Sequence, residues 1–157
     1  MIEFDLMKTM ITANHINEKY KHSDLTAKII GAAIEVHKIL GNGFQEVIYQ
    51  RALAIEMEER GLTFSREHKM ELQYKGRNIG TRRVDFFVEE KVLVEIKAII
   101  QMENVHLAQA INYLEAYDLE IGLLINFGAK SMQFKRLMRK VKNYDLSDCM
   151  KTMIREK

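Results

Sequence analysis

Apolar residues recur every three or four positions in the first third of the chain, which predicts two amphipathic helices. The first helix ends at residue 40, because the Gly-Asn-Gly segment at residues 41–43 tolerates left-handed backbone. Ser23 or Asp24 is expected to cap its N-terminus. The second helix spans residues 45–60 and ends at Gly61. The expected apolar positions of the first helix are Leu25, Ile29, Ala33, Val36 and Leu40. In the second helix Val47, Ala54, Ile55 and Glu58 alternate with polar positions.

After Leu62 the apolar period changes to two, which predicts β-strands. Short strands are expected at residues 63–66, 70–74 and 78–84, with a turn at residues 75–77. Residues 84–97 follow as a β-hairpin. One of its faces is expected to carry Val84, Phe86, Val88, Val92, Val94 and Ile96. Its other face is expected to carry Asp85, Phe87, Leu93, Glu95 and Lys97.

The register of this hairpin follows from its apolar pattern, because directly opposed residues of an antiparallel pair project from the same face. A three-residue loop at residues 89–91 places Val88 opposite Val92. Asp85 then lies opposite Glu95, with β-carbons roughly 4.5–5.5 Å apart, and Lys97 lies one same-face step further along. Two carboxylates at this separation destabilise a sheet unless water or a cation compensates their charge.

Two interpretations of this acidic pair compete. In a generic antiparallel hairpin a charged face is most often solvated. Phe87 and Leu93 weigh against that interpretation because they interleave with the charges, and residues 95–100 are apolar as in a strand that is covered on both faces. A buried pair of acids beside a lysine suits a divalent metal, and oxygen ligands favour magnesium or manganese. The lysine would then orient or activate a water molecule for attack on phosphorus.

Composition predicts one soluble domain. The chain has 157 residues, of which 47% are hydrophobic, and a chain of about 150 residues buries roughly 70% of its unfolded surface. The single Cys149 argues against a disulfide framework and fits a reducing compartment, so we expect a cytoplasmic protein. No apolar run approaches the ~20 residues that a membrane span requires. We divide the chain into a leader at residues 1–23, a domain at residues 24–142 and a basic tail at residues 143–157.

The net charge of +2 hides an uneven distribution of charge along the chain. Residues 1–129 hold 15 Lys or Arg against 19 Asp or Glu, a balance of −4. Residues 130–157 hold 9 Lys or Arg against 3 Asp or Glu, a balance of +6. Two interpretations of this basic segment stand equally: a solvated basic helix, or a surface that contacts phosphates.

Several motifs together resemble one known family. Asp85, followed ten residues later by Glu95-x-Lys97, resembles the signature of the PD-(D/E)xK nucleases, which are restriction-endonuclease-like phosphodiesterases. The segment GFQEVIY at residues 43–49 matches the motif of the GxxExxY proteins, a branch of that superfamily. Further matching segments are IIGAAIEVH at residues 29–37, YKG at residues 74–76 and GLLINF at residues 122–127. The resemblance covers about residues 24–140.

This resemblance implies an α/β fold with a restriction-endonuclease-like central mixed β-sheet flanked by α-helices. It also implies that Glu46, Asp85 and Glu95 hold Mg²⁺ or Mn²⁺ and that Lys97 is the catalytic lysine. Two positions depart from the family's pattern. Val84 stands in place of the proline before the acid, a change that many members tolerate. Asn42 stands where the usual proline lies between the glycines, which puts the stiffness of that loop in question but not the chemistry.

A third helix is expected at about residues 104–117, where the step from Gln109 to Tyr113 puts both side chains on one face. This pair resembles the Q-x-x-x-Y element of RecB-type nucleases. The resemblance implies that Gln109 hydrogen-bonds near the metal or the scissile phosphate, and that Tyr113 supports it. The alternative is a solvated glutamine beside a half-buried tyrosine.

Three further residues lie close to these motifs in the sequence. His37 falls on the inner side of the first helix, and we interpret it as a hydrogen-bonded structural histidine rather than a metal ligand. Arg82 and Arg83 point to alternate faces of their strand, so that one of them flanks the acidic pair and approaches a substrate phosphate.

These features lead us to expect a magnesium-dependent nuclease that acts on nucleic acid, with DNA as the expected substrate. The alternative is a catalytically inactive nuclease-fold module that binds nucleic acid or a protein partner. No membrane partner is expected, and the ten methionines leave a homodimer open. The sequence does not determine DNA or RNA as the substrate, strand preference, sequence specificity, or endo or exo action. It also does not determine the cellular pathway, the oligomeric state or whether the site is active.

Overall fold

A five-stranded mixed β-sheet forms the centre of the computed structural model of this chain, which describes residues 21–139. Its helices are α2 (Ser23–Leu40), α3 (Glu46–Glu59) and α4 (Asn104–Ala116). Its strands are β1 (Phe64–Tyr74), β2 (Arg77–Val88), β3 (Val92–Lys97), β4 (Ile121–Asn126) and β5 (Gln133–Met138). The predicted α/β class, a central mixed sheet with flanking helices, is confirmed. The predicted tail and almost all of the predicted leader lie outside the described residues, so the three-part division of the chain stays a prediction.

The strands lie side by side in the order of the sequence. All neighbouring pairs are antiparallel except β3 and β4, which are parallel and are connected through α4. A parallel pair needs a long crossover, and a helix supplies it. Each face of the sheet therefore has its own apolar core. The α2 and α3 helices cover the core that contains Phe86 and Ile125, whereas α4 covers the core that contains Leu93 and Leu124.

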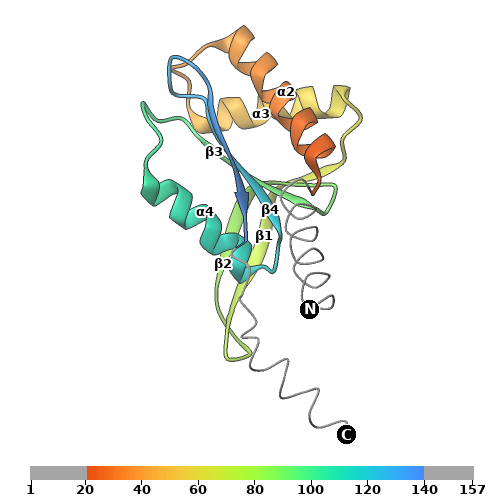
Figure 1. The fold of residues 1–157 in the computed structure, drawn as a ribbon, viewed down its shortest axis with the longest axis vertical. Helices are drawn as coiled ribbons and strands as arrows, with labels where there is room; N and C mark the ends of the chain where they lie inside the picture. The colour runs from red at the N-terminus through yellow and green to blue at the C-terminus, as the bar shows by residue number, and fades with distance from the viewer. Residues whose placement is uncertain (1–20, 140–157) are drawn as a thin grey trace, which may run out of the picture.

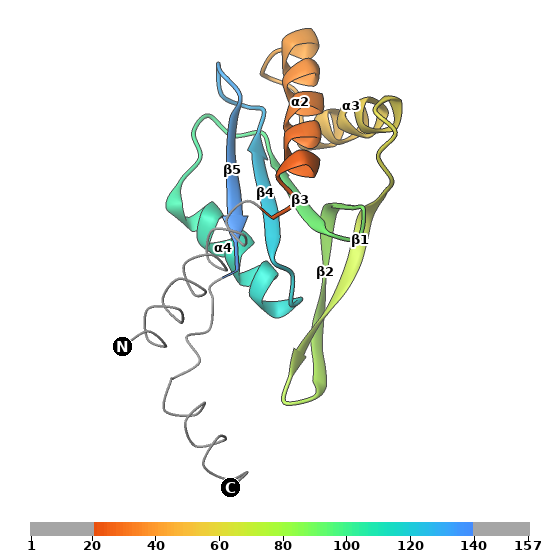
Figure 2. The ribbon, with the colours of Figure 1, turned by 45° about the vertical axis from the view of Figure 1, so that its right-hand side comes forward.

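The molecule is elongated, with helices and a hairpin turn at opposite ends. Figures 1 and 2 show α2 and α3 together at one end and the turn between β1 and β2 at the other. No helix within residues 21–139 has the length and apolarity that crossing a membrane would require.

Two expectations about the helices are wrong. Residue His22 occupies the N-cap position of α2 and makes no side-chain cap hydrogen bond, so neither Ser23 nor Asp24 caps the helix. On α3, Val47 and Ile55 are 39% and 57% exposed. The buried face consists of Tyr49, Gln50, Leu53, Ala54 and Met57. Both sets repeat at helical spacing, and contact with α2 and the sheet decides which face is buried.

The strands of the hairpins are longer than predicted. Residues 63–66 and 70–74 are expected as separate strands, but residues 64–74 form the continuous strand β1. Residues 78–84 and the first strand of the predicted 84–97 hairpin likewise form one strand, β2. The predicted register of the β2–β3 hairpin is confirmed, because Val88 pairs with Val92.

One side chain of that hairpin lies on the face opposite to the predicted one. Val84 packs in the α4 core with Leu93, and not with Phe86 in the other core. The change of face coincides with a distortion of the neighbouring strand, where Glu67 has a φ of 50° and the β1–β2 ladder has no pair between Arg66↔Phe86 and His68↔Val84. The alternation of side chains along β2 is therefore interrupted at Asp85, so that Val84 and Phe86 lie on opposite faces of the sheet.

The basic segment after residue 129 is a strand where it can be described. Residues 133–138 form β5, which pairs with β4 along its whole length, and Leu137 is buried in the α4 core. The expectation of a solvated basic helix is wrong for these residues, because their backbone hydrogen bonds complete the sheet edge. Residues 140–157 lie outside the described part.

A buried asparagine ties the segment after β3 to the end of β4. The Asn126 side chain is fully buried, and its Oδ1 accepts hydrogen bonds from the amides of Ile99 and Gly128, both at 3.0 Å. Its Nδ2 donates to the Ile99 carbonyl at 2.9 Å. A Cβ on Gly128 would lie 2.3 Å from the Ile99 nitrogen, so this close approach of two backbones requires glycine.

We therefore expect Gly128→Ala to destabilise the protein by about 3 kcal/mol or more, since the clash is with backbone atoms that cannot rotate away. Gly31→Ala is the matched control. Gly31 lies inside α2 with nothing near its added Cβ, so alanine should stabilise the helix by roughly 0.5–1 kcal/mol. Urea unfolding of both variants measures the two changes. Equal stability of the variants would contradict the backbone contact.

Candidate active site

The acidic pair lies where β2 and β3 separate. The last residues of the β2–β3 ladder are Phe86 and Val94, and Asp85 and Glu95 come directly after them. The Ile96 amide, one residue further, donates to Asp85 Oδ2 at 2.7 Å. Asp85 thus accepts a hydrogen bond from the backbone of β3. This bond fixes one carboxylate oxygen at the point where β2 and β3 separate.

A glutamine from α3 holds the other oxygen of this aspartate. Gln50 Nε2 donates to Asp85 Oδ1 at 2.9 Å, and the Gln50 side chain is only 7% exposed. Sequence reasoning missed Gln50. The available signal was its position one helical turn after Glu46 and between the buried residues Tyr49 and Leu53, where a polar side chain needs a partner.

The second acid is buried without full compensation. Glu95 is 5% exposed, and its Oε1 has no hydrogen-bond partner among the described residues. Burial, and after it the charge of Asp85, raise the pKa of Glu95 from its ordinary value of 4.5 to about 8. The positive charges of Arg82 and Lys97 act against this shift. The four side chains are therefore electrostatic neighbours.

Lys97 is the last residue of β3 and its side chain is half-buried. No described residue forms an ion pair with it within 4 Å. Its backbone is held on the other side, because the Lys97 carbonyl accepts from the Phe127 amide at 2.8 Å and Asn126 fixes the next residues. Hydrogen bonds thus hold the backbone of Lys97, and its ammonium group has no ion-pair partner among the described residues.

Side chains of α4 and β2 form the wall next to Glu95. The guanidinium of Arg82 lies over the Tyr113 ring, with 4.7 Å from Cζ to the ring centroid. Burial raises the pKa of Tyr113, and the nearby Glu95 raises it too, whereas the Gln109 side chain lowers it through a hydrogen bond. Arg82 Nε and the Tyr117 hydroxyl are buried without a hydrogen-bond partner in the described part. Gln109 itself is exposed.

The third predicted acid does not join this cluster. Glu46 is exposed at the first turn of α3, and no contact links it to Asp85 or Glu95. Within residues 21–139 no three His, Cys, Asp or Glu side chains gather closely enough to hold a metal ion. Of the predicted ligands, the structure brings together Asp85 and Glu95, and a role for Glu46 stays a prediction.

The donor set at the acidic pair nevertheless fits a divalent cation. Glu95 Oε1 is a buried oxygen without a partner, and two neighbouring carboxylates cannot both be ionised cheaply in this site. A cation with oxygen preference would satisfy that oxygen and compensate both charges. Magnesium and manganese match this chemistry.

Other motif residues have structural contacts. The Tyr49 hydroxyl donates to the Gly41 carbonyl at 2.6 Å and accepts from the Phe44 amide at 3.2 Å, while its ring stacks on Phe127 at 4.7 Å. This tyrosine therefore fixes the loop between α2 and α3. His37 Nε2 lies 3.1 Å from the Ala129 carbonyl, which confirms its interpretation as a hydrogen-bonded structural histidine.

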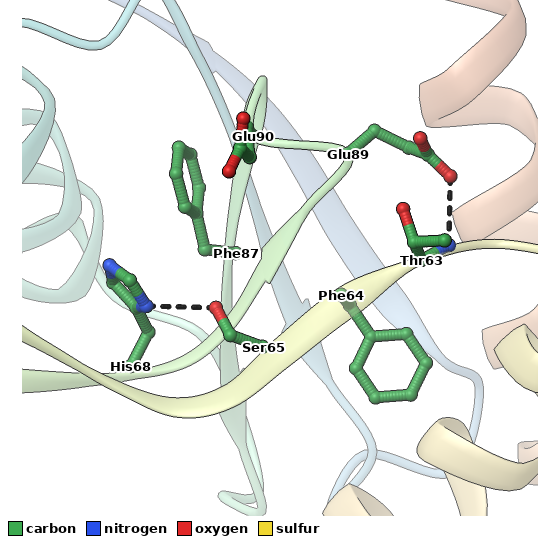
Figure 3. Close-up of a pocket in the computed structure, with 7 residues that line it drawn as sticks. All are labelled: Thr63, Phe64, Ser65, His68, Phe87, Glu89 and Glu90. Carbon is green, nitrogen blue, oxygen red and sulfur yellow. Dashed lines mark hydrogen bonds between the residues drawn. The ribbon is translucent and has the colours of Figure 1, made fainter.

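A separate hollow of about 480 Å³ lies along β1 and the end of β2, lined by Thr63, Phe64, Ser65, His68, Phe87, Glu89 and Glu90 (Figure 3). Ser65 Oγ and His68 Nδ1 lie 2.8 Å apart in it. None of the acidic-pair residues lines this hollow, and its two glutamates disfavour an anionic ligand. It is therefore distinct from the candidate active site.

Comparison with known proteins gives one family match. A family model described as the PD-(D/E)XK nuclease superfamily matches residues 23–137. Among solved structures, the crystal structure of SSO0001 is similar, with 16% sequence identity and a TM-score of 0.49. The similarity covers 90% of this chain and 70% of that one. None of the curated proteins matches this chain.

Proposed function

Because this chain belongs to the PD-(D/E)XK nuclease superfamily, we propose that it is a magnesium- or manganese-dependent phosphodiesterase that hydrolyses nucleic acid, with DNA as the preferred substrate. The fold agrees with this family: a mixed sheet flanked by helices is the predicted restriction-endonuclease-like architecture. Membership of the GxxExxY branch and a cytoplasmic location, which rest on the GFQEVIY segment and on the single cysteine, are part of the same proposal.

One observation supports the proposal most. Asp85 and Glu95 lie together at the separation of β2 and β3, and the buried Glu95 Oε1 has no hydrogen-bond partner among the described residues. A buried acid without a partner is costly, and such sites persist where function needs them. Lys97, two residues along β3, completes the acid-acid-lysine set that the family implies.

Each residue has a distinct task in the proposed reaction. Asp85 and Glu95 would hold the metal, and Gln50 keeps the Asp85 carboxylate in a fixed orientation. Lys97 would orient the attacking water and stabilise the charge that develops on the phosphate oxygens. When bound, the ion supplies Lewis acidity at the phosphate and lowers the pKa of the water.

The wall of the site would contact the substrate. The half-buried Arg82 guanidinium over Tyr113 is suited to a phosphate oxygen, and Arg83 is exposed. Gln109 and Tyr113 are proposed to act beside Arg82, and Glu46 to approach the metal when substrate is bound. These are assignments for mutagenesis.

A nuclease panel tests this proposal. Single-stranded, duplex and branched DNA and RNA are incubated with the full chain and Mg²⁺, Mn²⁺ or a chelator, beside the Lys97→Ala variant. Cleavage that needs the metal and Lys97 is the expected result. Saturable Mn²⁺ binding in calorimetry is expected as well. Nucleic-acid binding without a saturable metal site would instead favour an inactive nuclease-fold module.

The hydrogen bond from Gln50 gives a more specific prediction. Gln50→Leu is expected to lower activity roughly 10–100-fold, because a metal ligand that loses its orienting partner binds the metal less well. Gln45→Leu is the matched control, since Gln45 is exposed and makes no side-chain cap hydrogen bond to α3. Initial cleavage rates over a range of Mn²⁺ concentrations measure the effect. Equal rates for the two variants would exclude an orienting role.

A further inference from the structure

The hairpin of β1 and β2 extends beyond the rest of the sheet. Strand β3 pairs with β2 only over Phe86–Val88, so the hairpin residues 69–83 hydrogen-bond as strands only with each other. Figures 1 and 2 both show this ribbon reaching away from α2 and α3. We call residues 69–83 the basic ribbon, for the charges described below.

The tip of the basic ribbon is a tight turn. Tyr74 pairs with Arg77, which leaves Lys75 and Gly76 as a two-residue loop, and both have positive φ, 49° and 74°. Two-residue hairpin loops with positive φ at both positions match the right-handed twist of the strands. The ribbon is therefore narrow to its end, and its width is that of two strands.

Cations dominate the ribbon. It contains five basic residues and one acid, a balance of +4, compared with +2 for the whole chain. The basic residues are Lys69, Lys75, Arg77, Arg82 and Arg83, and the acid is Glu71. Within residues 21–139, none of the four exposed cations forms an ion pair. Their charges are thus available to a partner.

Two of these cations are placed against each other. Lys69 and Arg83 are directly opposed in the β1–β2 ladder, and both are exposed. Opposed residues project from the same face, and like charges in that position destabilise a sheet. An anion along this face removes the repulsion. Arg82, next to Arg83 in β2, lies over Tyr113 beside Glu95, so the basic ribbon begins at the wall of the acidic pair.

We propose that the basic ribbon binds the phosphates of double-stranded DNA and enters its major groove. This position would bring the DNA backbone to the acidic pair. The inference deepens the proposed function and rests on it for the choice of nucleic acid. The major groove of B-DNA is about 12 Å wide and admits a two-stranded ribbon. The major groove of duplex RNA is deep and narrow and does not. Exposed Tyr74 and Ile79 near the tip supply apolar contacts to base edges.

Binding without metal tests the ribbon separately from cleavage. Fluorescence anisotropy with a labelled duplex in chelator, over a salt series, compares the full chain with Lys75→Gln/Arg77→Gln. The slope of log affinity against log salt should become shallower by about 2, since each lost phosphate contact removes about 0.9. Lys75→Arg/Arg77→Lys should restore it. Lys28→Gln/Lys38→Gln removes two exposed cations of α2 and should leave the slope unchanged.

Each remaining outcome decides the proposal. An unchanged slope in the ribbon variant, or an equal change in the α2 control, would overturn it. An equal effect on single-stranded DNA or duplex RNA would overturn the assignment to duplex DNA, and so would a full chain that binds no duplex. If the ribbon variant weakens binding but the unmodified chain cleaves nothing with Mg²⁺ or Mn²⁺, the ribbon stands and the nuclease proposal fails.

Discussion

Lys97→Ala is expected to lower metal-dependent cleavage by about 10²–10⁴-fold while leaving the metal bound. The ammonium group has no ion-pair partner among the described residues, so its removal leaves no carboxylate unpaired and takes away only the charge proposed to orient the water and stabilise the phosphate. Asp85→Asn should instead lose cleavage and metal together, because a ligand is removed. Single-turnover cleavage and Mn²⁺ calorimetry on both variants separate the two roles.

The control for this pair is Lys91→Ala. Lys91 is exposed in the loop of the same hairpin, five residues before Ile96, and is expected to keep full activity. Thermal unfolding checks that each variant is folded. Two results would contradict the roles assigned to Asp85 and Lys97. One is a cleavage rate in Lys97→Ala equal to that of the parent, and the other is loss of Mn²⁺ binding in Lys97→Ala alone.

The acidic pair could be found from sequence because it depends on local geometry. In a hairpin with a three-residue loop, only one register keeps the apolar positions of the two strands on the same face, and Val88 pairs with Val92 as that register requires. The same argument places Glu95 and Lys97 on one face. Alternation along a strand assumes a regular pleat, however, and the distortion at Glu67 moves Val84 to the other core.

The partners of the acidic pair depend on packing between distant segments. Gln50 reaches Asp85 only because α3 packs over the sheet, and Arg82 meets Tyr113 only because the β3–β4 crossover brings α4 to that face. No short-range pattern determines either contact. The long stretch of β1 and β2 outside the main sheet was also hidden, since strand periodicity gives no information about which strands have a second neighbour.

Charge shows the same limit. Dividing the chain at residue 129 identified a basic C-terminal part, of which β5 is the portion that can be described. The concentration of cations in residues 69–83 becomes visible only when the ladder places Lys69 opposite Arg83. The pairing of the strands therefore determines which charged residues lie close together.

The metal-free protein is expected to lose stability as pH rises from about 4.5 to about 8. Burial and the neighbouring Asp85 raise the folded-state pKa of Glu95 to about 8, so the folded state binds more protons than the unfolded state between these values. Stability then falls with increasing pH. The contribution is fully present below pH 4.5 and lost above pH 8, and it is at most on the order of 5 kcal/mol. Urea unfolding across this range in chelator measures it.

Glu95→Gln should remove this dependence, because an amide of the same size stays neutral at every pH. The variant is then expected to be more stable than the parent at pH 8 and about equally stable at pH 4.5, while losing cleavage. Glu58→Gln, at an exposed position of α3, is the control and should leave the pH profile unchanged. Mn²⁺ should restore stability at pH 8 in the parent and not in Glu95→Gln, because the ion binds the ionised carboxylate of the folded state. Parallel pH profiles for the parent and Glu95→Gln would show that Glu95 is ionised at ordinary pH without a metal, and the charge compensation proposed for the ion would then be unnecessary.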